Sequence, residues 1–315
     1  MLMLRKIALI AMLLAGVLAA RPGRAQEASP EETLIYSEWH AASSAQDTAK
    51  AALVAQDYLK KYPAGAYAAY LKQWLGQLEA QRLSEAIAKK DVAAIVKIGE
   101  AKLQAEPGNL DYALAVAFNL RRFELFASPP SDAHLAEVKG FSEKAVALIA
   151  AGKVPTGADP AKWDKGQSLG WLYQNLALVA SKQEQPDEAL AQFEKSAAAD
   201  PKNRTQNAYS SLLSGSLLKA RYDDAVVRYK ALPEAQRTGA EPAPEAKAVL
   251  DEANAWADAT LAAYARFLAL SEGQAAFATT RARVEKTASD LWGYRHPEDP
   301  GGLAAFVAKA GVPNP

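Results

Sequence analysis

The sequence of 315 residues contains no cysteine and only three histidines. The lack of cysteine excludes disulfide scaffolds, thiolate metal centres, iron–sulfur clusters and cysteine nucleophiles. His40, His134 and His296 are far apart, and none belongs to an HExxH motif, so we predict no zinc site. Glycine-rich phosphate loops and calcium-binding loops are also missing, and we therefore expect no cofactor.

An excess of charge of one sign is missing too, because 36 Lys and Arg residues balance 36 Asp and Glu residues. A nucleic-acid-binding protein normally has a marked basic excess on one face, so we expect no nucleic-acid partner. Apolar residues make up 50% of the chain and charged residues 23%, which is typical of a globular protein.

The N-terminal region has two basic residues followed by a charge-free stretch of 14 residues at 7–20. That length is too short to cross a bilayer comfortably as a helix, but it suits the core of a signal peptide. Gly23 and Ala25 fit the −3 and −1 positions of a cleavage site before Gln26, while an earlier site and an uncleaved membrane anchor are the alternatives. Removing residues 1–25 takes away four basic residues and leaves a net charge of −4. We expect a periplasmic or secreted chain without an integral membrane span, and without a lipid anchor because no cysteine follows the leader.

The exported part is predicted to be all-α. Alternating runs of β-branched and aromatic residues are scarce, whereas Ala, Leu, Glu, Lys and Gln dominate nearly every segment. Seven clusters of Pro, Gly, Asn and Asp divide the sequence into about a dozen helices, at 63–65, 107–109, 128–132, 152–159, 185–186, 201–203 and 238–244.

One pair of these helices has a regular pattern of small and bulky residues. The segment 170–203, GWLYQNLALVASKQEQPDEALAQFEKSAAADPKN, resembles a tetratricopeptide repeat over its whole length. Ala177 and Ala189 stand at its two small positions, Phe193 at its aromatic position and Pro201 at its terminal proline. The resemblance implies two antiparallel helices that approach closely at the alanines, with the phenylalanine between neighbouring hairpins.

A second unit of this kind is predicted at 206–236, where Ala225 and Tyr229 repeat the small and aromatic positions. These positions lie 36 residues after Ala189 and Phe193, whereas the repeat length is 34, and we expect a turn to contain the two extra residues. There are two departures from the pattern: Ser196 stands where alanine is usual in the first unit, and Leu213 stands at the first small position of the second.

The expected architecture is a solenoid of antiparallel helix hairpins, with repeats over 26–243 and a helical cap over 244–315. Segments 49–63 and 93–109 look like second helices of further units, and they are either degenerate repeats or simply repeat-like pairs. An apolar stripe over 249–268 predicts a helix longer than a repeat helix, which would cover the exposed end of the stack.

The resemblance also implies a binding surface, because the first helices of tetratricopeptide repeats line a concave groove. In this register the groove residues are Trp171, Gln174, Leu178, Ser181, Lys182, Asn207, Ser210 and Ser214. The alternative is an ordinary solvent-facing surface.

Two sequence motifs suggest catalysis, but neither has the expected context. Residues 166–170 spell GxSxG around Ser168, yet the preceding PAKWDK is not a strand, as a nucleophile elbow requires. Ser216 and Lys219 form SxxK within a predicted helix, without an SDN element. We therefore expect no enzymatic activity.

The leading hypothesis is an exported, non-enzymatic helical-repeat protein that binds another protein or a peptide, with cell-envelope assembly as a candidate process. The alternative is a periplasmic component that binds a small molecule or a glycan. That alternative needs an enclosed aromatic pocket where Trp74, Trp171 or Trp256 converge. An enzyme would instead need convergent polar groups with perturbed pKa values.

Overall fold

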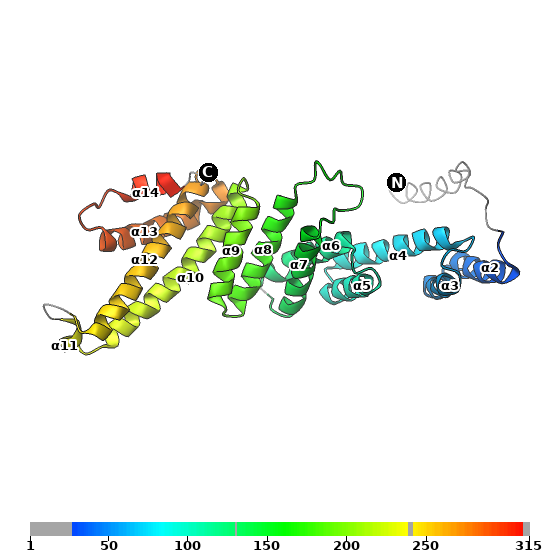
Figure 1. Cartoon of the computed structure of the whole chain (residues 1–315), viewed down its shortest axis with the longest axis horizontal. Coiled ribbons are helices and arrows are strands. Elements are labelled where there is room, and N and C mark those ends of the chain that lie inside the picture. Colours follow the sequence, from blue (N-terminus) through cyan, green and yellow to red (C-terminus); the bar gives the residue numbers. More distant parts are fainter. Residues whose placement is uncertain (1–26, 130, 239–241, 311–315) are drawn as a thin grey trace. The chain divides into compact units, whose positions relative to one another are not determined.

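A computed structural model describes residues 27–129, 131–238 and 242–310 (Figure 1). The signal peptide expected at 1–25 lies outside the described residues. Helix accounts for 78% of the described residues, and they contain no strand. The predicted all-α class is therefore confirmed, with thirteen α-helices in the described part of the chain.

The chain divides into two compact units, with the boundary between Ala88 and Lys89. The described helices of the first unit are α2 (Pro30–Ser44), α3 (Thr48–Lys61) and α4 (Ala68–Lys89), the last of which ends at the boundary. Ser29 and Glu32 form a reciprocal capping box at the start of α2, in which each side chain accepts a hydrogen bond from the other residue's backbone nitrogen. The core of this unit is built largely of alanine and aromatic side chains, namely Ile35, Trp39, Ala42, Ala51, Ala55, Tyr58, Ala68 and Leu71.

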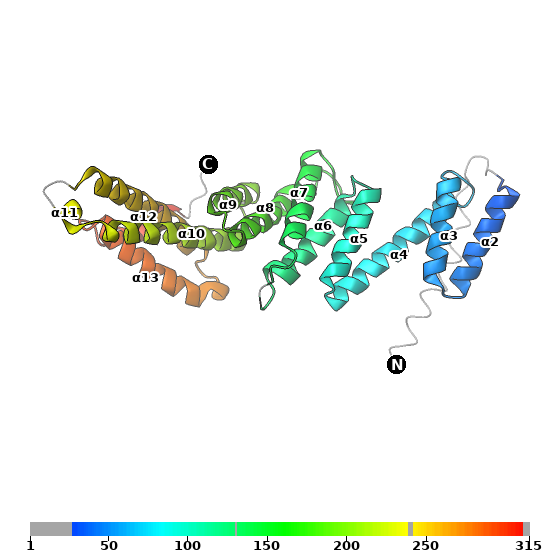
Figure 2. The same cartoon turned by 90° about the horizontal axis from the view of Figure 1, so that it is seen from below.

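The second unit begins with helices in which each packs against the next along the chain (Figure 2). Their bounds are α5 (Val92–Ala105), α6 (Leu110–Leu120), α7 (Leu135–Ala150), α8 (Lys165–Lys182) and α9 (Pro186–Ala199). A π-helical turn, η1 (Arg121–Leu125), extends α6. The stretch 151–164 between α7 and α8 is an irregular loop, as its prolines and glycines predict.

The hairpin of α8 and α9 has the packing that its alanines predict. Ala177, Ala189 and Phe193 are at most 2% exposed and belong to one hydrophobic cluster. Helix α9 ends at Ala199, just before Pro201. The atypical Ser196 is also buried, and its hydroxyl donates a 2.8 Å hydrogen bond to the carbonyl oxygen of Gly170 on α8. The hydroxyl at this position thus joins the two helices.

The prediction of a second two-helix unit at 206–236 is wrong. A single helix, α10 (Arg204–Ala231), spans 28 residues and runs beside α12 (Figure 2). Between Gly215 and Ala231 the sequence has no proline, glycine or asparagine that would favour a turn. Ala225 is buried within this continuous helix.

The C-terminal helices are α11 (Glu234–Arg237), α12 (Pro244–Leu270), α13 (Ala278–Arg295) and α14 (Leu303–Ala310), with a 3₁₀ turn, η2 (Ala275–Phe277), before α13. The long helix expected over 249–268 is confirmed as α12. Its apolar stripe packs with α13 in a core of Ala208, Ala257, Leu261, Tyr264, Phe267, Leu268, Val284, Ala288, Leu291 and Trp292.

Candidate functional site

Three of the eight residues predicted to line a concave groove lie in the interior. Gln174, Asn207 and Ser210 are at most 2% exposed. The side-chain amide of Gln174 donates a 2.8 Å hydrogen bond to the hydroxyl of Ser210, which joins α8 to α10. The amide of Asn207 donates to the carbonyl oxygen of Asp200 at 2.9 Å, at the end of α9. These three side chains connect helices within the protein, and their buried positions do not support a role in contacting a partner.

The face of α8 that was predicted to line the groove is contacted by residues of the segment between α6 and α7. The guanidinium of Arg121 donates to the side-chain oxygens of Gln174 and Asn175, the latter at 2.8 Å. Burial lowers the pKa of Arg121 to about 10, and amide oxygens, not a carboxylate, accept its hydrogen bonds from α8. Further along the same face, Lys182 forms an ion pair with Asp132.

The other residues predicted to line the groove lie in different parts of the second unit. Trp171 has its ring 6.0 Å from that of Phe118, in an edge arrangement. Leu178 packs against the hydrophobic cluster of the α8–α9 hairpin. Ser214 lines a recess of about 400 Å³ among α9, α10 and α12, to which Ser210 also contributes. Ser181 lines a different and larger groove. The structure therefore does not bring the eight residues together on one open surface.

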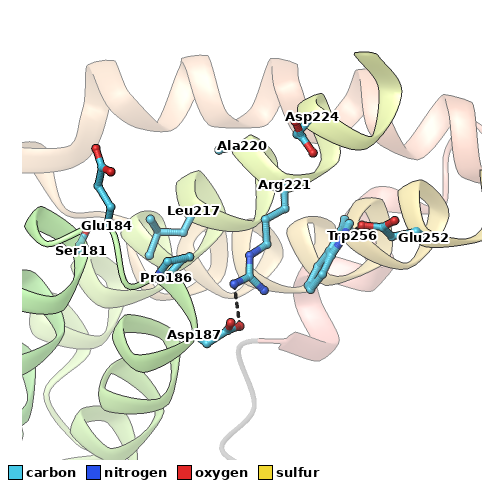
Figure 3. Close-up of a pocket in the computed structure, with 10 residues that line it drawn as sticks. All are labelled: Ser181, Glu184, Pro186, Asp187, Leu217, Ala220, Arg221, Asp224, Glu252 and Trp256. Atoms are coloured by element: carbon cyan, nitrogen blue, oxygen red, sulfur yellow. Dashed lines mark hydrogen bonds and ion pairs between the residues drawn. The ribbon is translucent and has the colours of Figure 1, made fainter. Parts of the chain in front are cut away.

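The larger groove lies between the α8–α9 turn, the middle of α10 and α12 (Figure 3). Its volume is about 610 Å³, and we call it the acidic groove. The lining residues are Ser181, Glu184, Pro186, Asp187, Leu217, Ala220, Arg221, Asp224, Glu252 and Trp256.

The apolar part of the acidic groove comes from Pro186, Leu217, Ala220 and Trp256. The guanidinium of Arg221 lies over the Trp256 ring, with 4.7 Å between its central carbon and the ring centroid (Figure 3). An aromatic face attracts a cation through its quadrupole, and this pair holds α10 against α12. The face of the indole is thus in contact with a cation of the chain itself.

The polar part of the acidic groove has four carboxylates, those of Glu184, Asp187, Asp224 and Glu252. Asp187 accepts a 2.6 Å hydrogen bond from Arg221. Asp224 and Glu252 both accept hydrogen bonds from Arg228, at 2.9 and 2.6 Å. The hydrogen bond from Arg228 holds the pKa of Glu252 below its usual value, so this carboxyl is ionised at neutral pH.

The two catalytic motifs of the sequence lie on helices. Ser168 is in the first turns of α8, so the GxSxG segment is not a nucleophile elbow. Ser216 donates to the carbonyl oxygen of Leu212 at 3.0 Å, and Lys219 pairs with Asp223 at 2.7 Å. Among the described residues, no group of three or more acidic or histidine side chains is placed to hold a metal ion. None of the described helices combines the length and the apolar character needed to span a membrane.

Comparison with known proteins does not assign this chain to a family. No protein-family model matches it, and no curated protein matches it.

The acidic groove as a whole was not predicted from the sequence, although Ser181 was predicted to line a concave groove and Trp256 was a candidate for an aromatic pocket. Its residues lie in three separate segments, 181–187, 217–224 and 252–256, which the packing of α10 on both α9 and α12 brings together. The single signal in the sequence was Trp256, a large aromatic residue within the stripe of α12. It remains partly exposed, unlike Leu261, Tyr264 and Leu268 of the same stripe.

Proposed function

We propose that this chain is an exported, non-enzymatic helical-repeat protein of tetratricopeptide type that binds another protein or a peptide. The acidic groove carries the proposal, because it is open to solvent and offers a partly exposed tryptophan together with unused carboxylate oxygens. Grooves between packed helices commonly receive peptide segments in this way. Cell-envelope assembly is the process that an exported scaffold would serve.

The hairpin of α8 and α9 supports the repeat assignment through its close alanine contacts and the buried Phe193. The neighbouring elements are less regular, since α10 is one long helix and η1 extends α6. We therefore propose a solenoid in which one hairpin follows the repeat geometry closely, and in which α10 and α12 form an elongated pair at its end.

A small-molecule or glycan binder has less support. Such a protein encloses most of its ligand, with aromatic side chains converging on it. In the second unit Trp256 lines the acidic groove, whereas Trp171 packs beside Phe118 and is not among the groove's lining residues.

Two tryptophan variants test the proposed function. The protein expressed from the complete sequence is screened against an immobilised library of peptides, and the bound peptides are titrated by fluorescence anisotropy. We expect Trp256→Ala to weaken binding about tenfold or more, while Trp171→Ala leaves it unchanged. Loss of binding in Trp171→Ala alone would favour the face first predicted from the sequence, and no binding of any peptide would contradict the proposal. Thermal unfolding of both variants controls for their folding.

The intact mass of the exported protein tests the proposed localisation. We expect the form recovered from a bacterial periplasm to lack residues 1–25. Recovery of the uncleaved chain in the membrane fraction would instead indicate an anchor.

A further inference from the structure

We infer that the acidic groove recognises a cationic peptide segment, in which lysine or arginine side chains alternate with apolar ones. This inference rests on the proposed function and specifies the class of partner for the same site.

The charges around the acidic groove are predominantly negative. Four of its lining residues are carboxylates and one, Arg221, is a cation. Arg228 adds a second cation beside the groove through its bonds to Asp224 and Glu252. The balance of these six groups is therefore two negative charges, and an anionic partner would be repelled.

The carboxylates also remain accessible to a partner. The side chain of Asp187 is 86% exposed and that of Asp224 is 68% exposed, although each pairs with an arginine. A carboxylate offers about four lone-pair sites, and the hydrogen bond that the structure gives Asp187 uses only one of them. An incoming ammonium or guanidinium group can therefore bind without displacing the internal arginines.

The internal arrangement of Arg221 shows what the groove can hold. Its guanidinium lies between the Trp256 ring, at 4.7 Å, and the Asp187 carboxylate, at 2.6 Å (Figure 3). The rest of the groove offers a partner's cations the carboxylates of Glu184 and Asp224, and it offers the partner's apolar side chains the surfaces of Leu217 and Pro186. The apolar residues favour apolar side chains between the cations, and the carboxylates select the sign of the charge.

Three labelled peptides of equal length test this inference. In the first lysine alternates with leucine, in the second glutamine replaces lysine, and in the third glutamate replaces it. We expect the lysine peptide to bind the full-length protein about tenfold more tightly than the glutamine peptide at low ionic strength. Its affinity should fall as salt is added, because exposed charges are screened.

A double variant with a matched control localises the effect. Glu184→Gln with Asp187→Asn removes two groove carboxylates, while Glu143→Gln with Glu285→Gln removes two exposed carboxylates elsewhere in the second unit. We expect the first variant to lose most of the preference for lysine and the second to keep it.

The outcomes separate the inference from the proposed function. Equal binding of the lysine and glutamine peptides, or tighter binding of the glutamate peptide, would overturn the cationic preference and leave peptide binding intact. If both double variants lost the preference for the lysine peptide equally, the inference would also be overturned, because the effect would then depend on the net charge of the protein and not on the groove. If none of the three peptides binds while the library yields other ligands, the cationic preference is wrong and the proposed function stands. The salt dependence of the unmodified protein gives an answer even if a variant fails to fold.

Discussion

The hydroxyl of Tyr58 donates a 2.8 Å hydrogen bond to the carboxylate of Glu32, which is only 4% exposed. The same carboxylate also accepts hydrogen bonds from the backbone nitrogens of Ser29 and Ala66, so it ties the start of α2 to α3 and to the start of α4. A buried carboxylate is therefore held by neutral donors in the centre of the first unit.

These hydrogen bonds predict an acid-sensitive first unit. The backbone of Ser29 first, and then Tyr58, lower the pKa of Glu32 below its ordinary value of 4.5. A carboxyl whose pKa is lowered in the folded state stabilises the fold at pH values above its ordinary pKa. This stabilisation is lost as the pH falls through the pKa of the folded state. Glu32→Gln should lower stability at neutral pH and flatten its decline in acid, as measured by urea unfolding at several pH values. Glu38→Gln, on the exposed side of α2, should change neither quantity.

The α8–α9 hairpin predicts a large cost for removing its aromatic side chain. Phe193 is 2% exposed and packs with Ala177 and Ala189. Phe193→Ala should destabilise the protein by about 3–5 kcal/mol, because it loses burial and leaves a cavity. Val227→Ala, at a position 65% exposed, should cost less than about 0.5 kcal/mol in the same urea titration. Similar costs for the two variants would show that the hairpin does not pack as described.

The interaction of Arg121 with α8 gives a prediction with a neighbouring control. Arg121→Ala removes hydrogen bonds to Gln174 and Asn175 and leaves their oxygens without this donor. We expect a loss of about 1.5–3 kcal/mol, which is typical of hydrogen bonds to charged groups. Arg122→Ala removes an equal charge at an exposed position and should cost much less. If chemical denaturation gave equal losses of stability for the two variants, the loss of a positive charge, and not the loss of the contact with α8, would explain the destabilisation.

The contact of α10 with α12 is tested at Gly215. A methyl group there would meet the ring of Tyr264 on α12, so Gly215→Ala should destabilise the protein by about 1–3 kcal/mol. In a Tyr264→Ala background the added cost of Gly215→Ala should largely disappear, which a double-mutant cycle measures. Full additivity would argue against the continuous pairing of these two helices.

The sequence predicted the features that local chemistry determines. The all-α class followed from composition, and the ends of α8 and α9 followed from their turn residues and Pro201. The prediction of a second repeat unit was wrong because Ala225 and Tyr229 match only the side-chain pattern of a repeat. A hairpin also needs residues that end the first helix and form a turn, and these are missing within α10.

The candidate binding site was harder to predict from the sequence than the helices were. Repeat positions indicate which residues face a neighbouring helix, but they do not show what covers that face. Arg121 and Asp132 come from a segment that no repeat pattern describes, and they meet the residues expected to be open. The acidic groove depends on contacts between segments distant in sequence, so only the folded structure reveals it.

The uninterrupted course of α10 has a mechanical consequence for recognition. A helix of 28 residues extends about 42 Å, and its middle forms one wall of the acidic groove while its whole length adjoins α12. Because this wall is one continuous helix, it has no turn at which it could bend. If a peptide binds here as proposed, this wall loses little conformational freedom on binding, and the preference among peptides depends on how well each one fits the existing groove.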